Sequence, residues 1–116
     1  MPSPDQIQAY AALLGCTPRE AKLRLDRLEF DLRERVARAA VEQARSGADS
    51  LHDPIEDEAA MAGVLLLAER EAETMTQESA DISGYLLWSE KAKILRSRYG
   101  VTWFNPSEMN PHTFYS

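Results

Sequence analysis

Four acidic side chains form two pairs whose spacing suits metal chemistry. Asp53 and Glu56 are three residues apart, and Glu78 and Asp81 repeat that spacing after residues 57–77. Side chains three apart on a helix share one face, so each pair can present two carboxylates together. Hard divalent cations prefer oxygen ligands of this kind. This pattern is the strongest candidate for metal chemistry in the chain.

The carboxylate spacing looks like the Glu-x-x-Glu … Glu-x-x-Asp pattern of all-α nucleotide pyrophosphatases resembling MazG. The resemblance implies acids that hold magnesium ions, which in turn engage a triphosphate. Asp53 replaces the first glutamate of that pattern, and it equally suits the cap of a helix that starts at Pro54. With nineteen acidic residues in the chain, such spacing also arises by chance. A magnesium-dependent pyrophosphatase is therefore kept as an alternative.

No other residue set points to catalysis or to a bound group. The two histidines, His52 and His112, fall in or beside expected loops, and neither belongs to a Glu-x-x-His pair. Cys16 has no spaced partners for zinc. The sequence also has no glycine-rich phosphate loop and no nucleophile elbow. We expect no enzyme activity, no catalytic residue, no metal site and no cofactor.

The stretch from Tyr10 to Ala21 resembles the helix-turn-helix family around its turn. Ala11 and Gly15 are four residues apart, as in that motif, and Leu14 and Cys16 fill its apolar positions. The resemblance implies that the following helix enters the major groove of DNA. The bases of that helix, Arg19, Lys22 and Arg27, are interspersed with acids, and a net-acidic chain gains little from phosphate neutralisation. A DNA-associated factor is the second alternative.

Length and composition suit one soluble all-α domain. The chain has 116 residues, 44% of them hydrophobic and 28% charged, with a formal net charge of −6. Charge is uneven: residues 49–81 carry one base and ten acids. Either these acids are an ordinary solvated helix face, or they form an acidic surface that attracts a basic partner or mimics a polyanion through its summed field. Its members are Asp53, Glu56, Asp57, Glu58, Glu69 and Glu73.

The expected compartment is the cytoplasm, without membrane association. The longest apolar run has five residues, Val64 to Ala68, which is far too short for a bilayer. The N-terminus lacks the basic and apolar regions of a secretory signal. A single cysteine fits a reducing environment.

Helix signals predict four helices, at 4–14, 18–46, 54–78 and 81–99. Three begin at capping-box patterns, with Ser3, Thr17 and Asp53 as the caps. No proline or glycine interrupts the second helix, so it is expected to run unbroken as the centre of a small helical bundle. Residues 1–100 form the helical domain in this interpretation.

The predicted helix 18–46 carries apolar residues on two opposite faces. One face holds Ala21, Leu25, Leu28, Leu32, Val36 and Ala39; the other holds Leu23, Phe30, Ala37, Val41 and Ala44. A surface helix needs only one apolar face, so the second is expected to be covered by the chain or by another copy. We therefore assign Leu23, Phe30 and Val41 to partner binding.

The last segment, 101–116, differs from the helical part. Its two prolines and two asparagines predict an extended arm without regular helix. A disordered tail is usually poor in large aromatic residues, so the arm should contact either its own domain or a partner. The aromatic residues assigned to that contact are Trp103, Phe104, Phe114 and Tyr115.

Together these features favour a non-catalytic helical subunit or adaptor for protein–protein interaction. The partner is another protein or a second copy, with nucleic acid less favoured. A component of a larger assembly, such as a phage structural protein or a host-directed inhibitor, belongs to this class.

Overall fold

The computed structural model describes residues 2–44, 50–77 and 85–111, and all the regular structure in these ranges is helical. The all-α prediction is confirmed. The elements are α1 (Pro4–Leu14), α2 (Pro18–Asp26), α3 (Phe30–Ala44), the 3-10 helix η1 (Pro54–Asp57), α4 (Ala59–Thr76), α5 (Tyr85–Tyr99) and α6 (Pro106–Met109).

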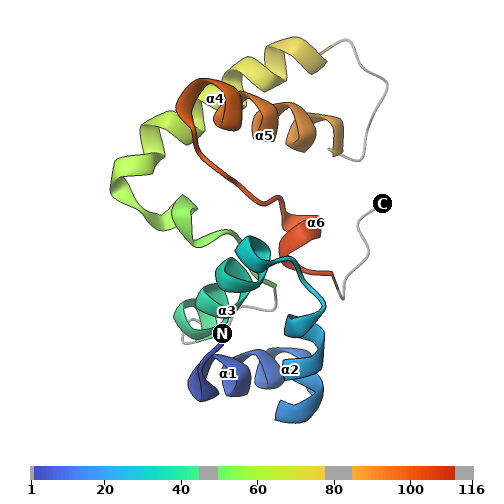
Figure 1. Ribbon diagram of the computed structural model, residues 1–116. Coiled ribbons are helices and arrows are strands. Elements are labelled where there is room, and N and C mark those ends of the chain that lie inside the picture. Colours follow the sequence, from blue (N-terminus) through green and yellow to red (C-terminus); the bar gives the residue numbers. More distant parts are fainter. Residues whose placement is uncertain (1, 45–49, 78–84, 112–116) are drawn as a thin grey trace.

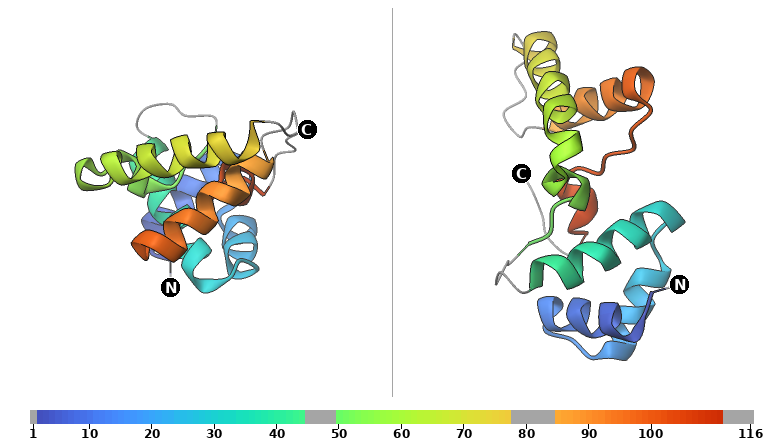
Figure 2. Two further views of the ribbon diagram at one scale, coloured as in Figure 1. Left: turned by 90° about the horizontal axis from the view of Figure 1, so that it is seen from above. Right: turned by 90° about the vertical axis from the view of Figure 1, so that its left-hand side faces the viewer.

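The helices form two packed groups at opposite ends of a molecule measuring 44 × 31 × 26 Å. α1, α2 and α3 lie together at one end, and α4 and α5 lie side by side at the other (Figures 1 and 2). Each group has its own apolar core. The first core is built around Tyr10, Leu25 and Val36, and the second around Leu65, Ala68 and Leu95.

The helix predicted at 18–46 is two helices, which corrects the expectation of one long central rod. α2 ends at Asp26, and α3 begins at Phe30. The break needs no glycine or proline, because the guanidinium of Arg33 donates hydrogen bonds to the carbonyl oxygens of Leu25, Asp26 and Leu28 at 2.9–3.2 Å. The last carbonyls of a helix have no partner four residues further on. The carbonyl of Leu25 here accepts from the N–H of Leu28 at 3.1 Å as well as from Arg33.

Breaking the helix changes which of its apolar residues are buried. After the turn, α3 folds back and packs against α1, so that α2 and α3 each bury one face in the first core. Ala21 and Leu25 from α2 join Val36, Ala39 and Ala40 from α3 there. Ala37, expected on the opposite face, is buried as well.

The helix predicted at 54–78 is also divided. Residues 54–57 form η1, Glu58 is extended, and α4 starts at Ala59. Asp53 does act as a cap, but its side chain accepts from the N–H of Ile55 at the start of η1. The helix predicted at 81–99 corresponds to α5 from residue 85; its expected first residues lie outside the described ranges.

Two buried amide side chains hold the linker between α3 and η1. Gln43 exchanges two hydrogen bonds with the backbone of His52, at 2.7 and 3.0 Å. Asn110 does the same with the backbone of Leu51, at 2.6 and 2.7 Å. The backbone N–H and C=O groups of Leu51 and His52 are thus hydrogen-bonded without a neighbouring strand. Because Asn110 and Gln43 bind adjacent residues, the linker also connects the C-terminal segment to α3.

The segment after α5 is only partly the extended arm that the sequence predicts. Gly100 takes the left-handed conformation (φ 64°), and residues 101–105 then run between the two helical groups (Figure 1). A short helix, α6, follows, although regular helix was not expected. Asn105 caps it with a complete capping box, and Pro106 occupies the first turn, where its missing N–H costs nothing.

Within the described part of the chain, no helix has the length and apolarity needed to cross a membrane.

Candidate functional site

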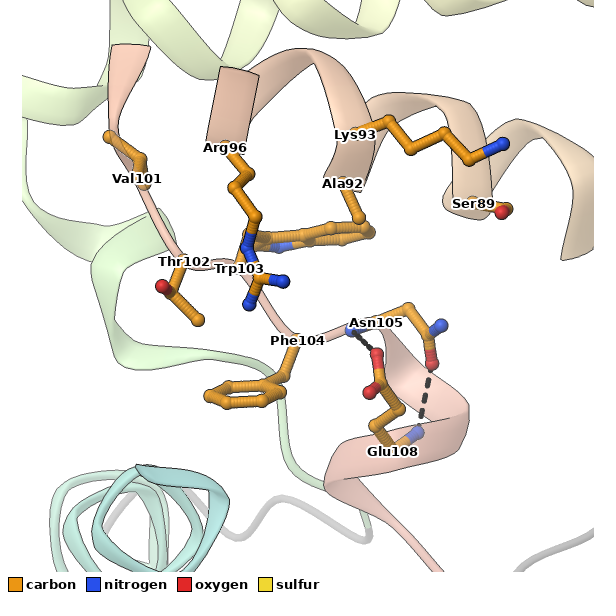
Figure 3. Close-up of a pocket in the computed structure, with 10 residues that line it drawn as sticks. All are labelled: Ser89, Ala92, Lys93, Arg96, Val101, Thr102, Trp103, Phe104, Asn105 and Glu108. Atoms are coloured by element: carbon orange, nitrogen blue, oxygen red, sulfur yellow. Dashed lines mark hydrogen bonds between the residues drawn. The ribbon is translucent and has the colours of Figure 1, made fainter. Parts of the chain in front are cut away.

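A pocket of about 380 Å³ opens where α5, the 101–105 segment and α6 meet (Figure 3). We call it the Trp103 pocket. Its lining combines two bases, one acid, three small polar residues and four apolar ones: Lys93, Arg96, Glu108, Ser89, Thr102, Asn105, Ala92, Val101, Trp103 and Phe104.

Two local sequence features position the chain segments that line the Trp103 pocket. Gly100 ends α5 and reverses the chain, and the N–H of Val101 bonds back to the carbonyl oxygen of Leu95 at 3.0 Å. The next residues run alongside α5 until the capping box of α6 turns the chain again. In that box the carboxylate of Glu108 accepts from the N–H of Asn105 at 3.1 Å. Pocket shape thus depends on two adjacent helix caps.

The positive charge of the Trp103 pocket comes from the C-terminal half of α5. Figure 3 shows Arg96 reaching toward the 102–105 segment, whereas Lys93 points away from it. Lys93 is paired with Glu90 at 3.4 Å. Arg96 has no ion pair among the described residues, and Glu108 is the one carboxylate in the lining. Arg96 is therefore the base best placed to receive an added anion.

Trp103 is held from two sides. Its indole N–H donates to the carboxylate of Glu56 at 3.1 Å, and the ammonium of Lys91 lies 4.4 Å from the ring centroid. Lys91 is buried, so this cation–π contact compensates part of the desolvation of its charge. A fixed indole gives the pocket a rigid apolar wall.

An ion pair between the half-buried Arg35 and the buried Asp53 fastens the pocket wall to α3. The carboxylate of Asp53 accepts from Arg35 at 2.7 and 2.8 Å and from the N–H of Phe104 at 3.0 Å. The same nitrogen of Arg35 donates to the carbonyl oxygen of Thr102 at 3.0 Å. Residues 102–104 are therefore anchored on the side away from the pocket.

Trp103 and Phe104, which the sequence assigns to a contact with the domain or a partner, have little surface left for a partner. Both are buried by their own chain, Trp103 in the second core and Phe104 in the first. A partner reaches only the edges that line the pocket. The predicted contacts at Phe114 and Tyr115 lie outside the described residues.

The face predicted from Leu23, Phe30 and Val41 is not one surface. Leu23 lies on α2 and Phe30 at the start of α3, so the helix break places them on different elements. Phe30 is 59% exposed and lines a second pocket of about 300 Å³ between α1 and α3, with Pro2, Gln6, Arg33, Glu34, Ala37 and Arg38. Val41 is half-buried. Leu23 and Phe30 are exposed in the single chain, so the described chain itself does not cover them, and their assignment to partner binding stays a prediction.

One of the six residues predicted to form the acidic surface is not at the surface. Asp53 is fully buried in its ion pair with Arg35, which corrects its assignment to the surface. Glu56, Asp57 and Glu73 are exposed, and Glu58 and Glu69 are half-buried. Several already have partners, since Asp57 pairs with His52 and Glu58 with Arg38.

The first half of the carboxylate pattern is occupied by protein contacts. Asp53 is bonded to Arg35, and Glu56 accepts from Trp103, while Glu78 and Asp81 lie outside the described ranges. Across residues 2–44, 50–77 and 85–111, no three side chains of the His, Cys, Asp or Glu type are grouped to hold a metal ion.

Sequence reasoning missed the bases of α5. Bases near the C-terminus of a helix are favoured by its dipole, so Lys93 and Arg96 do not stand out in the sequence as binding residues. The charge distribution could have pointed to them, because residues 82–116 carry four bases and two acids in an otherwise acidic chain.

No family model, no curated protein and no solved structure matches this chain.

Proposed function

We propose that the protein is a non-catalytic interaction subunit, and that its Trp103 pocket receives an acidic side chain from an extended segment of a partner protein. The observation that carries this proposal is Arg96: it faces an open pocket and makes no ion pair with any described residue. A guanidinium in this setting suits a carboxylate, which it can bind with two parallel hydrogen bonds.

The rest of the lining favours a peptide over a bare inorganic anion. Ala92, Val101 and the edges of Trp103 and Phe104 offer apolar surface beside the base. A peptide with an acidic residue next to an aliphatic or aromatic one satisfies both kinds of surface. The anchored 102–104 segment supports binding with little reorganisation, which lowers the entropic cost of association.

A peptide array tests this proposal directly. Peptides that place Asp or Glu beside Leu or Phe are compared with matched peptides that carry Asn or Gln. We expect the wild type to retain the acidic peptides and to release them as salt rises. Arg96→Glu should weaken retention by about tenfold or more, since hydrogen bonds to charged groups contribute roughly 1.5–3 kcal/mol.

Arg19→Glu is the matched control. It makes the same charge change at an exposed arginine of α2, which is not part of the pocket. Its binding should equal that of the wild type. Equal retention of acidic and amide peptides, or equal loss in both variants, would refute the pocket as an acid-binding site.

DNA association is the second candidate, and one structural observation favours it. α2 is nine residues long and follows the tight turn at Gly15, so its length suits a helix-turn-helix corner, which a single helix over 18–46 would not. Arg19 and Arg27 make no ion pair among the described contacts, whereas Lys22 is paired with Asp26. Fluorescence polarisation with duplex DNA decides this candidate. A wild type that binds no DNA would exclude it, and binding that survives the triple change of Arg19, Lys22 and Arg27 to Glu would exclude α2 as the helix that contacts DNA.

A further inference from the structure

A third pocket, of about 180 Å³, lies in the first helical group, where α1, the end of α2 and the C-terminal segment meet. Figure 1 shows the chain after α6 reaching the connection between α2 and α3. Liquid water occupies roughly 30 Å³ per molecule, so this pocket has room for a group of several heavy atoms. We call it the Tyr10 pocket, and its lining is Tyr10, Arg24, Arg27, Leu28 and Pro111.

The phenol of Tyr10 is buried without a hydrogen-bond partner. Tyr10 is 1% exposed, and its hydroxyl takes part in no hydrogen bond within the described part of the chain. Burial raises the pKa of this hydroxyl, and the charge of Arg24 partly lowers it, so the polar end of the ring lies on the side of the pocket where Arg24 is. A buried hydroxyl without a partner is costly, and proteins nearly always satisfy such a group with protein atoms, water or a ligand.

Two arginines give the Tyr10 pocket a positive charge. Arg27 is exposed, and its guanidinium makes no ion pair with any described residue. Arg24 is paired with Glu20 at 3.4 Å, but both side chains are about half exposed, and such pairs contribute little. No carboxylate is among the described residues that line the pocket. The carbonyl oxygens of residues 25 and 26, which would repel an anion, already accept from Arg33.

We propose that the Tyr10 pocket binds the phosphate group of an organic phosphate monoester. Arg27 and Arg24 supply charged donors, and the hydroxyl of Tyr10 supplies a third donor from the most buried side of the pocket. A phosphate monoester carries about −1.5 to −2 charges at pH 7 and three acceptor oxygens, and guanidinium groups bind phosphate with paired hydrogen bonds. Leu28 and Pro111 place apolar surface beside the bases, which suits an organic body attached to the phosphate.

The C-terminal wall of the Tyr10 pocket is held in place by buried contacts. Pro111 directly follows Asn110, whose amide donates to the carbonyl oxygens of Leu51 and Pro106 at 2.7 and 2.8 Å. Met109, one residue earlier, is buried in the first core together with Tyr10. The pocket is therefore formed before a ligand arrives, which lowers the entropic cost of binding.

An NMR titration of the full chain with phenyl phosphate, at constant ionic strength, tests the proposal. We expect saturable shifts of the amide signals around residues 10 and 24–28, with a Kd of about 1 mM or tighter. Inorganic phosphate should bind more weakly, because it lacks the organic body that contacts Leu28 and Pro111. Benzoate carries the same ring on a planar carboxylate with a single charge, and it should bind about tenfold more weakly or worse than phenyl phosphate.

Tyr10→Phe separates the site from the fold, since it removes only the hydroxyl. Because that hydroxyl has no partner within the described chain, the melting temperature without ligand should equal or exceed that of the wild type. The affinity for phenyl phosphate should fall about fivefold or more. Arg27→Gln should weaken binding by about tenfold. Arg19→Gln makes the same change at an exposed arginine of α2 outside the pocket, so its affinity should equal that of the wild type.

Four results would overturn the inference. They are a wild type without saturable shifts at up to about 10 mM phenyl phosphate, benzoate binding as tight as that of phenyl phosphate, a Tyr10→Phe variant that binds like the wild type, and equal losses in the Arg27→Gln and Arg19→Gln variants. A lower melting temperature of Tyr10→Phe would contradict the premise that the hydroxyl has no partner.

The phosphate site is independent of both proposed functions. It does not involve the Trp103 pocket, so its failure would leave the peptide-binding proposal standing. Arg27 is also one of the bases of the DNA candidate. Tyr10→Phe keeps every base in place, so a loss of phosphate binding in that variant belongs to the pocket and not to the charged surface of α2.

Discussion

The half-buried Arg35 and the fully buried Asp53 form an ion pair at the junction of the two helical groups, with Nη1 2.7 Å from Oδ2. Arg35 comes from α3, and Asp53 precedes η1. Through the N–H of Phe104 and the carbonyl oxygen of Thr102, the pair also binds the segment that lines the Trp103 pocket. One charged contact thus connects three parts of the chain.

Asp53→Asn should lower the free energy of unfolding by about 2–3 kcal/mol. The change removes the charge that compensates Arg35. Breaking one partner of a fully buried pair costs roughly 3–5 kcal/mol, and Arg35 is 25% exposed, so water offsets part of that cost. Urea unfolding measures the loss. The control is Glu20→Gln in the exposed Arg24–Glu20 pair, where the expected change is under about 1 kcal/mol. Equal effects at the two sites would contradict the role of the buried pair.

Arg33→Met should destabilise the protein by about 1.5–3 kcal/mol. It keeps an apolar stem but removes the guanidinium that bonds to three carbonyl oxygens at the end of α2. Amide hydrogen exchange should accelerate around residues 26–30. Arg27→Met, whose side chain takes part in none of the described hydrogen bonds, should change stability by less than about 0.5 kcal/mol. No difference between the two variants would mean that the helix break has another cause.

The hydroxyl of Tyr10 should make stability fall at high pH. Burial raises the pKa of Tyr10 above its ordinary value of 10.0; Arg24 lowers it to a lesser degree, and Cys16 adds to the increase. The folded state therefore disfavours the phenolate. This stabilising contribution is fully present below pH 10.0 and is lost as the pH rises through the higher pKa of the folded state.

Tyr10→Phe provides the comparison for that pH dependence. Urea midpoints of both proteins from about pH 8 to about pH 11 should run parallel at first. The wild type should then lose more stability than the variant. Parallel curves over the whole range would show that Tyr10 titrates alike in the folded and unfolded chains.

Removing residues 101–116 should abolish cooperative unfolding. The deletion takes Trp103 out of the second core and Phe104 and Met109 out of the first. Truncating one buried aromatic costs about 3–5 kcal/mol, and whole domains are stable by only about 5–15 kcal/mol. Calorimetry should show no sharp transition. A chain that ends at Pro111 keeps these residues and should melt as a folded protein; a stable chain ending at Gly100 would mean that the segment serves only a partner.

Local sequence signals determined the starts of α1 and α2 and two of the helix ends. Ser3 caps α1 with the complete capping box, and the Thr17 side chain accepts from the N–H of Glu20 at the start of α2. Gly15 and Gly100 take the left-handed conformation at helix ends, as expected of glycine there. These features involve residues within a few positions of one another, so their energetics are contained in a short stretch of chain.

The tertiary structure alone decided where helices break and which charges are buried. The end of α2 depends on Arg33, which follows it in another helix, and the burial of Asp53 depends on Arg35 and on Phe104, 51 residues away. The Trp103 pocket likewise exists only because residues 102–104 are fastened beside α5. From the sequence, an acidic residue just before a proline is predicted to be an exposed helix cap. Its burial and its ion pair cannot be predicted locally, because they arise only when distant segments of the chain meet.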